Sequence, residues 1–355
     1  MADYYREDKN GISLVSLSGS WEEMGRQYGE LYRRELHTIY HALLLPSAKG
    51  TEEGYARMVA LSMGKYRDYP ARFRSFFRGM AETSGLSEEQ LIVCNAMETV
   101  YTVEEEPKCS TLAVWGDYAA DKLLFGRNYD YNEIFRAFKD YVSLCVYHPA
   151  DGSVPTATVG YVGEIYCANG LNRNGIFLAL NNASKSSAEK HPGRLISLAQ
   201  LLQLELDAPD MDYVHAFFRT VKCSSAYIVG VADKNEARIY EWCGLGMRWV
   251  ECPRPGVQAA TNHFVSPRWD LPTPDDASSW QSLTRRANLL SQAERYKGTI
   301  DPERMEQIMS LPIEDGGVLF HYSVYQLVAV PEELKLYIRV IDGADWTEFD
   351  LSEVF

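Results

Sequence analysis

The order of strand-like and helix-like segments constrains this chain most. From residue 140 onward, short runs rich in Val, Leu, Ile and Tyr are twice interrupted by a pair of helical segments. This alternation predicts two packed sheets between helical layers. The expected strands are 140–147, 156–161, 175–182, 226–231, 237–242, 248–251, 258–261, 324–330 and 334–340, and the expected helices are 193–206, 211–222, 280–297 and 301–311.

The first 108 residues are expected to form a mainly helical segment. Ser20 and Glu23 have the spacing of a capping box, which starts a helix that continues to about residue 43. Gly25 and Gly29, four residues apart in this helix, permit close approach of another backbone at some cost in helix stability. The other expected elements are a strand over 12–17 and helices over 51–66, 69–83 and 87–101.

Composition and charge limit the partners of this protein. Its 355 residues are 46% apolar and 24% charged, which is ordinary for a soluble globular protein. The net charge of −14 argues against binding to nucleic acid or to an anionic membrane surface. The N-terminus has no apolar core of signal-peptide length, and no run approaches 18 apolar residues. We therefore expect a cytoplasmic protein without membrane partners.

Neither a metal nor a cofactor is expected. The motifs Gly-x-Ser-x-Gly, His-Glu-x-x-His, Gly-x-x-x-x-Gly-Lys and Gly-x-Gly-x-x-Gly are all missing from the sequence. His37 and His41 have the spacing of metal ligands on a helix, but no third ligand is near them, which favours an ordinary helix face. Seven scattered cysteines without a Cys-x-x-Cys pair indicate reduced thiols, and most are expected to be small buried apolar residues.

One cysteine differs from the others through its neighbours. Two apolar runs, 111–115 and 122–125, flank a polar Gly-Asp segment, which is the pattern of a β-hairpin with a loop of about five residues. The register of such a hairpin places Cys109 opposite Arg127, at the end away from the turn. The positive charge of Arg127 would then favour a thiolate on Cys109.

A thiol with an ordinary pKa of about 8.5 needs a base to attack an amide at neutral pH, and the hairpin contains no histidine. Cleavage of the Lys108–Cys109 bond would provide one. The new α-amino group of Cys109 would have a pKa of about 7.7 to 8.0 and could accept the proton of the thiol. Asp130 is close enough in sequence to reach the Cys109 nitrogen and orient that amine.

The Cys-Ser-Thr at 109–111, followed by Gly-Arg-Asn-Tyr-Asp-Tyr at 126–131, resembles a known group of enzymes. This group is the choloylglycine hydrolase and isopenicillin N acyltransferase family of N-terminal nucleophile (Ntn) hydrolases, which includes penicillin acylases and acid ceramidases. The resemblance implies an α+β fold, a four-layer αββα sandwich of two antiparallel sheets. It also implies self-cleavage at Lys108/Cys109, which would separate a pro-segment, 1–108, from a catalytic domain, 109–355.

Downstream motifs are similar to those of the same family. The segment 172–182 is similar to its Asn-x-x-Gly strand, whose last residue gives an oxyanion-hole backbone N–H. Counting from the glycine selects Asn182, with Asn181 one register away. The segment 261–264 looks like the one whose asparagine, here Asn262, is the second oxyanion donor. His263 beside it could pair with the cysteine, tune Asn262 or contact the substrate.

The motif Ser-x-x-Arg at 282–285 resembles the one that brings a second arginine to the site. It points to Arg285, and only the spacing distinguishes Arg285 from Arg286. Tyr129 and Tyr131 could line an acyl pocket, although packing in the core is the commoner role of tyrosine.

Each of these residues also has an ordinary interpretation. Arg127 and Asp130 could form a structural ion pair, and Asn182 and Asn262 could be turn residues. Amide chemistry, however, needs a nucleophile, a base and N–H donors aimed at a developing oxyanion, and this chain has candidates for all of them in the family's order.

The sequence therefore predicts a cysteine Ntn amidohydrolase that cleaves a linear N-acyl amide through a thioester on Cys109. The expected partners are a small-molecule N-acyl amide or acyl thioester and the chain's own pro-segment, retained as a subunit. A second copy of the chain is a further candidate partner. If an amine rather than water resolves the thioester, the protein is an acyltransferase. A third alternative is a precursor that is never cut and serves as a binding or scaffold protein.

Overall fold

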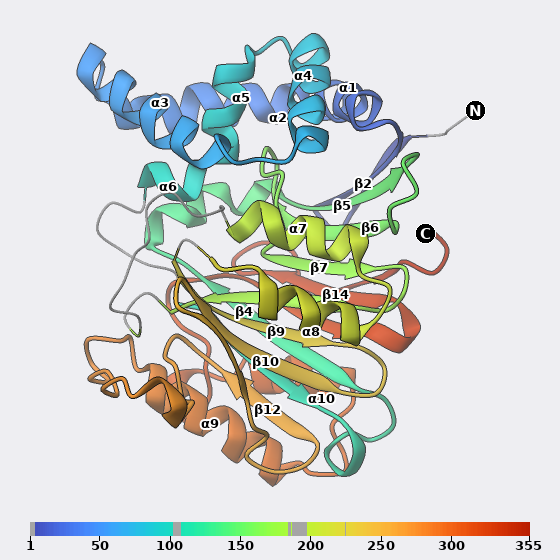
Figure 1. Ribbon diagram of the computed structural model, residues 1–355, viewed down its shortest axis with the longest axis vertical. Helices are drawn as coiled ribbons and strands as arrows, with labels where there is room; N and C mark the ends of the chain where they lie inside the picture. Colours follow the sequence, from blue (N-terminus) through green and yellow to red (C-terminus); the bar gives the residue numbers. More distant parts are fainter. Residues whose placement is uncertain (1–3, 102–107, 184–185, 187–196, 224) are drawn as a thin grey trace.

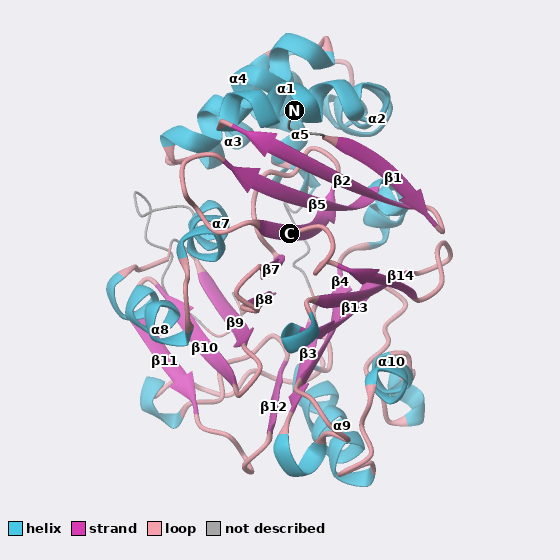
Figure 2. Cartoon of the chain, turned by 90° about the vertical axis from the view of Figure 1, so that its right-hand side faces the viewer, coloured by secondary structure: helices cyan, strands magenta, loops and turns pink. Residues whose placement is uncertain are grey.

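A computed structural model describes residues 4–101, 108–183, 186, 197–223 and 225–355. Within these residues two β-sheets pack face to face, and helices cover their outer faces (Figures 1 and 2). The predicted α+β, four-layer αββα arrangement is confirmed. A further group of helices, from the N-terminal part of the chain, lies across one end of the larger sheet (Figure 1).

The two sheets are built from strands that are distant in sequence. In the larger sheet the order is β1 (Tyr5–Lys9), β2 (Ile12–Gly19), β5 (Val142–Pro149), β6 (Thr156–Tyr161), β7 (Asn169–Asn172), β8 (Phe177–Asn182), β9 (Ala226–Ala232), β10 (Ala237–Cys243) and β11 (Gly246–Val250). In the smaller sheet it is β12 (Val257–Ala260), β3 (Ser110–Val114), β4 (Leu124–Asp130), β13 (Ser323–Val330), β14 (Lys335–Val340) and β15 (Thr347–Asp350).

The prediction of two antiparallel sheets is wrong at one pair. Strands β2 and β5 are parallel, whereas the other neighbouring strands are antiparallel. A parallel pair requires a long crossover connection, and here most of the N-terminal helices and the whole β3–β4 hairpin lie between the two strands in sequence. The N-terminal segment is thus not a separate helical body, because its strands extend the larger sheet.

Two pairs of helices form the outer layers of the sandwich. Helices α7 (Ser197–Asp207) and α8 (Met211–Thr220) contact the larger sheet, and α9 (Ser282–Arg295) and α10 (Pro302–Met309) contact the smaller one (Figure 2). Between the sheets, the rings of Phe125 on β4 and Phe177 on β8 are 5.1 Å apart. Gly230 on β9 lets Phe125 approach, since a Cβ there would lie 2.5 Å from its ring. Among the described residues, no helix is sufficiently long and apolar to cross a membrane.

The N-terminal helices are shorter than the sequence predicts. They are α1 (Trp21–Leu31), α2 (Arg33–Thr38), a π-helical turn (Ile39–Leu44), α3 (Glu52–Tyr66), α4 (Ala71–Ser84), α5 (Glu88–Asn95) and α6 (Met97–Tyr101). The single long helix predicted from residue 20 is interrupted at Tyr32, whose backbone leaves helical geometry. Tyr32 is fully buried, and its hydroxyl forms a 2.7 Å hydrogen bond with that of Ser13 on β2. This tertiary contact outweighs the continuous helical pattern.

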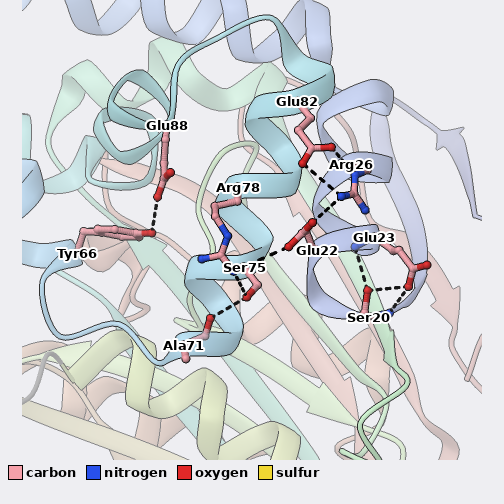
Figure 3. Close-up of polar contacts among 10 residues, drawn as sticks. All are labelled: Ser20, Glu22, Glu23, Arg26, Tyr66, Ala71, Ser75, Arg78, Glu82 and Glu88. Carbon is pink, nitrogen blue, oxygen red and sulfur yellow. Dashed lines mark hydrogen bonds and ion pairs between the residues drawn. The ribbon is translucent and has the colours of Figure 1, made fainter.

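Helix α1 begins at the predicted capping box and packs closely against α4, as its glycines predicted (Figure 3). Ser20 and Glu23 form the capping box, because each side chain accepts a hydrogen bond from the backbone N–H of the other residue. At Gly25 a Cβ would lie 2.0 Å from the carbonyl oxygen of Phe76, so the two helix backbones touch there. Arg26 of α1 adds a hydrogen bond across the same interface.

Candidate active site

Cys109 and Arg127 are neighbours, as predicted, but the register of the hairpin is not the predicted one. Thr111, not Cys109, pairs with Arg127, so the strands are offset by two residues. The loop is also longer than predicted because Gly116–Tyr118 forms a 3₁₀ turn within it. An offset of two keeps every side chain on its original face of the sheet. Arg127 therefore still reaches Cys109 diagonally, and its Nη2 lies 3.3 Å from the Cys109 Sγ.

Burial keeps the Cys109 thiol neutral. The residue is only 1% exposed, and this burial raises the pKa of the thiol. The charge of Arg127 lowers that pKa, as the sequence suggested, but its effect is smaller than that of burial. The Sγ lies 3.9 Å from the backbone carbonyl oxygen of Asp130. Arg127 thus holds the sulfur in place without ionising it.

Asp130 has a buried carboxyl group, and only one of its two oxygens has a hydrogen-bond partner among the described residues. Its Oδ1 accepts a 2.5 Å hydrogen bond from the Ser323 hydroxyl, and its Oδ2 has no partner among the described residues. Burial raises the pKa of Asp130 to about 6, and the charges of Arg285 and Arg127 oppose the rise. The backbone of Asp130, rather than its carboxylate, binds the preceding segment, because the Lys108 N–H donates to its carbonyl oxygen at 2.7 Å.

Arg285 is fully buried and connects the hairpin to the rest of the site. Its Nη1 donates to the carbonyl oxygens of Lys108, at 2.7 Å, and Cys109, at 3.1 Å. Its Nη2 donates to the Asn262 Oδ1 at 2.7 Å. Arg286 points elsewhere, since its Nε donates to the carbonyl oxygen of a residue on β12. The structure therefore brings Arg285, and not Arg286, to the Lys108–Cys109 bond.

The candidate asparagines lie at the same place but make different contacts. Asn181, at the end of β8, is fully buried, and its Oδ1 accepts a 3.3 Å hydrogen bond from Arg127. Asn182 takes part through its backbone, because its carbonyl oxygen accepts a 2.8 Å hydrogen bond from the Asn262 Nδ2. Both register alternatives from the sequence thus contact the site, one through a side chain and one through the main chain.

Ser282 fixes the segment that carries Asn262. Its hydroxyl oxygen accepts a 2.8 Å hydrogen bond from the Asn262 N–H and lies 2.8 Å from the His263 Nδ1. Burial, with the charges of Arg286 and Arg285, lowers the pKa of His263 to about 4. The imidazole is therefore neutral at neutral pH, and its contact with Ser282 helps to position the segment 261–264.

Tyr129 and Tyr131 lie in a buried aromatic stack beside the hairpin. The Tyr129 ring is parallel to that of Tyr325 at 4.4 Å, and the Tyr131 ring lies 6.0 Å from Tyr129. The Tyr129 hydroxyl donates to the carboxylate of Glu98. These rings contact other side chains, and a substrate-binding role for Tyr129 and Tyr131 stays a prediction.

Several polar groups around this stack were not among the candidates that the sequence suggested. Glu164 is buried, accepts a 2.5 Å hydrogen bond from the Tyr166 hydroxyl, and has a pKa raised well above its ordinary value by burial. A signal existed, because Glu164 is an isolated acid within the apolar run 161–168. Ser323, the partner of Asp130, had no such signal, since a serine at the start of a strand is common.

No metal centre accompanies these groups within the part of the chain that the structure describes. There, no set of three or more His, Cys, Asp or Glu side chains is arranged to hold a metal ion. The rings of His37 and His41 stack 5.6 Å apart on the N-terminal helices.

Comparisons with known proteins find similar structures but no similar sequences. No protein-family model matches the chain, and no curated protein matches it. The Caenorhabditis elegans N-acylethanolamine-hydrolyzing acid amidase ortholog is 16% identical, with a TM-score of 0.48 over 68% of this chain and 100% of its own. A conjugated bile acid hydrolase from Clostridium perfringens is 13% identical, with a TM-score of 0.47 over 69% and 93%. Penicillin V acylase from Agrobacterium tumefaciens is 10% identical, with a TM-score of 0.48 over 69% and 87%.

At this level of likeness the chemistry of the present chain rests on the atoms of its own site. These atoms form one connected unit. A thiol lies beside the peptide bond that precedes it, a buried guanidinium binds the carbonyl oxygen of that bond, and a second guanidinium contacts the sulfur. A carboxylate with an unoccupied oxygen belongs to the same cluster.

Proposed function

We propose that this protein is a cysteine amidohydrolase that first cuts its own Lys108–Cys109 bond and then cleaves the C–N bond of a linear N-acyl amide. One observation carries the proposal: Arg285 donates a 2.7 Å hydrogen bond to the carbonyl oxygen of Lys108, the residue just before the thiol. A buried cation on that oxygen stabilises the negative charge that develops when a nucleophile attacks the carbonyl carbon. Arg127 holds the candidate nucleophile, the Cys109 sulfur.

Self-cleavage needs only these groups and one water molecule. The Cys109 sulfur attacks the carbonyl carbon of Lys108, and the oxygen becomes an oxyanion bound by Arg285. The C–N bond then breaks, and the thiol proton passes to the departing nitrogen of Cys109. Water hydrolyses the resulting thioester, which leaves a Lys108 carboxylate, a free thiol and a free α-amino group on Cys109.

The new amine is the base that the uncut chain lacks. An α-amino group has a pKa of about 7.7 to 8.0, which suits proton transfer near neutral pH. The unoccupied Oδ2 of Asp130 is available to accept a hydrogen bond from it. In each turnover the amine takes the proton of the thiol, the sulfur forms a thioester with the acyl group, the proton passes to the leaving amine, and water releases the acid.

The oxyanion of an external substrate has three candidate donors. Arg285 is one, and the Asn182 backbone N–H and the Asn262 side chain are those that the family resemblance implies. The Asn262 Nδ2 lies next to Asn182, because it donates a 2.8 Å hydrogen bond to the Asn182 carbonyl oxygen. Arg127, which bridges the Cys109 sulfur and the Asn181 side chain, would stabilise the thiolate once cleavage changes its surroundings.

The pro-segment has a structural reason to remain bound after the cut. Strand β2 pairs with β5 along its whole length, and α1 packs on β2. Separation of 1–108 from 109–355 would expose this edge of the larger sheet and the rings of Trp21 and Phe76, which contact Tyr147 of β5. We therefore propose a two-fragment protein in which both fragments contribute strands to one sheet.

Intact mass under denaturing conditions tests the proposal. The purified protein should give two species that meet at Lys108/Cys109, and Cys109→Ala should give one full-length species. Cys252→Ala is the matched control, because Cys252 is exposed and belongs to no part of the site. A full-length wild-type protein after long incubation, or cleavage that persists in Cys109→Ala, would refute the proposal. Adding amines to the matured enzyme with its substrate would then distinguish hydrolysis from acyl transfer.

A further inference from the structure

The side chain of Lys108 lies in an aromatic cage next to the bond that we propose is cut. Its Nζ is 3.8 Å from the ring centroid of Tyr322 and 5.4 Å from that of Trp280. Lys108 is 2% exposed, which is unusual for a lysine, since burial of an ammonium group is costly without compensation. The two aromatic faces contribute to such compensation through cation–π attraction.

The cage is built into the machinery of the site. The backbone carbonyl oxygen of Trp280 accepts a 3.0 Å hydrogen bond from the Arg285 Nε, and the Tyr322 carbonyl oxygen accepts one of 3.1 Å from the Tyr131 N–H. Trp280 and Gln281 both have left-handed backbone conformations, with φ of 57° and 55°. Such a conformation is costly for a bulky residue, and it persists only where the surroundings enforce it. The group that holds the scissile carbonyl thus also fixes one wall of the cage.

Self-cleavage makes Lys108 the acyl group of the chain's own first substrate. The Cys109 sulfur and the Lys108 carbonyl group define where the carbonyl carbon of an acyl group must lie during attack. From that carbon, the Lys108 side chain extends toward Tyr322 and Trp280. The same sulfur attacks external substrates, so their acyl groups extend in the same direction. Once Lys108 leaves the site, the Tyr322 face that its ammonium group contacts can receive another cation.

We propose that the substrates of this protein are amides whose acyl group carries a cation at the distance of a lysine side chain, as in an ω-aminoacyl amide. This inference rests on the proposed function and names its substrate class. A neutral chain of the same length would gain the apolar contact with the rings but not the cation–π attraction. The net charge of −14 favours the approach of a cationic substrate. Hydrolysis of 6-aminohexanoyl amide consumes one water and yields 6-aminohexanoic acid and the free amine.

A matched pair of substrates tests the inference on the matured wild-type protein. The two compounds are the 6-aminohexanoyl amide and the heptanoyl amide of the same chromogenic amine. The first carries an ammonium group at the position where the second carries a methyl group. We expect kcat/KM to be about tenfold or more higher for the aminohexanoyl amide, which corresponds to about 1.4 kcal/mol. Tyr322→Leu should bring the ratio of the two values toward one, and Tyr322→Phe, which keeps the aromatic face, should preserve it.

The outcomes separate the inference from the function on which it rests. If the heptanoyl amide is cleaved as well as or better than the aminohexanoyl amide, the inference is wrong and the amidohydrolase remains. A preference that survives Tyr322→Leu in full would also overturn the cage as its cause. If neither compound is cleaved and no acyl group forms on Cys109, both the function and the inference fail. The comparison within the wild-type protein does not depend on the folding of any variant.

Discussion

Replacing Arg285 by Lys keeps a positive charge but removes the planar guanidinium group, one nitrogen of which binds the Lys108 carbonyl oxygen. Arg285 makes hydrogen bonds to the backbone oxygens of Lys108, Cys109 and Trp280 and to the Asn262 side chain. An ammonium group is a single point of charge that cannot reproduce this geometry. Loss of one donor to a developing oxyanion costs about 10²–10³ in rate, or about 2.7–4 kcal/mol. We therefore expect self-cleavage of Arg285→Lys to be slower by about that factor.

The assay follows the appearance of the two fragments by intact mass after synthesis of the uncut chain. Arg286→Lys is the matched control, because the neighbouring arginine loses one hydrogen bond to Ala259 but contacts neither Lys108 nor Cys109. We expect it to mature at the wild-type rate. Circular dichroism and urea unfolding establish that both variants are folded. If folded Arg285→Lys matures as fast as Arg286→Lys, the reasoning about the oxyanion is refuted.

Two further predictions concern buried groups outside the site. Gly25→Ala should lower the free energy of unfolding, measured in urea, by about 1–3 kcal/mol or more, because its Cβ would overlap the Phe76 carbonyl of α4. Gly64→Ala is the matched control, because a Cβ there points into open space beside α3. It should be neutral or stabilise the protein by up to about 1 kcal/mol. Equal effects would contradict the backbone contact. Both carboxylate oxygens of Glu205 are buried without partners among the described residues, and burial raises its pKa well above 4.5. The folded state therefore holds this proton more tightly than the unfolded state. As pH rises above about 4.5, the free energy of unfolding of the wild type should fall relative to that of Glu205→Gln, by at most about 1.4 kcal/mol per pH unit. Parallel stability curves of the two proteins from pH 5 to 8 would contradict this.

Much of the fold could be predicted because each element carries a local pattern. Each strand and helix expected after residue 140 is found within a few residues of its expected position, except that residues 193–196 of one expected helix lie outside the described part. The short strands β7 and β15 were not expected. The register of the central hairpin could not be predicted, because it depends on a 3₁₀ turn whose stability comes from tertiary contacts such as the bridge between Ala119 and Ile300. The parallel pairing of β2 with β5 is likewise invisible to local periodicity.

The proximity of the candidate site residues could be predicted better than their individual contacts. The ordered motifs selected Cys109, Arg127, Asp130, Asn262 and Arg285, and the structure brings all five together. Only the motif spacing selected Arg285 over Arg286, and the direction of each side chain depends on where the helix lies against the hairpin. Sequence spacing could not show that burial outweighs a nearby cation in setting the pKa of the thiol.

Buried acids are the main features that the sequence analysis did not consider. Glu205 lies on the apolar face of α7, three and four residues after two buried leucines. A helical pattern with a glutamate at a core position is detectable in advance. What the sequence cannot show is whether such an acid is paired, and here Glu205 is unpaired within the described residues whereas Glu164 is bonded to Tyr166.

The central claim is that the sulfur of Cys109 is the reacting atom, and acylation of the matured protein tests it most directly. The protein is treated with an activated acyl donor, digested and mapped by mass spectrometry, with exposed Cys252 as the internal reference for unassisted thiol reactivity. We expect a hydroxylamine-sensitive thioester on Cys109 that forms faster than the adduct on Cys252 and is lost as water resolves it. Acylation of Cys252 alone, with Cys109 unmodified in cleaved protein, would contradict the account.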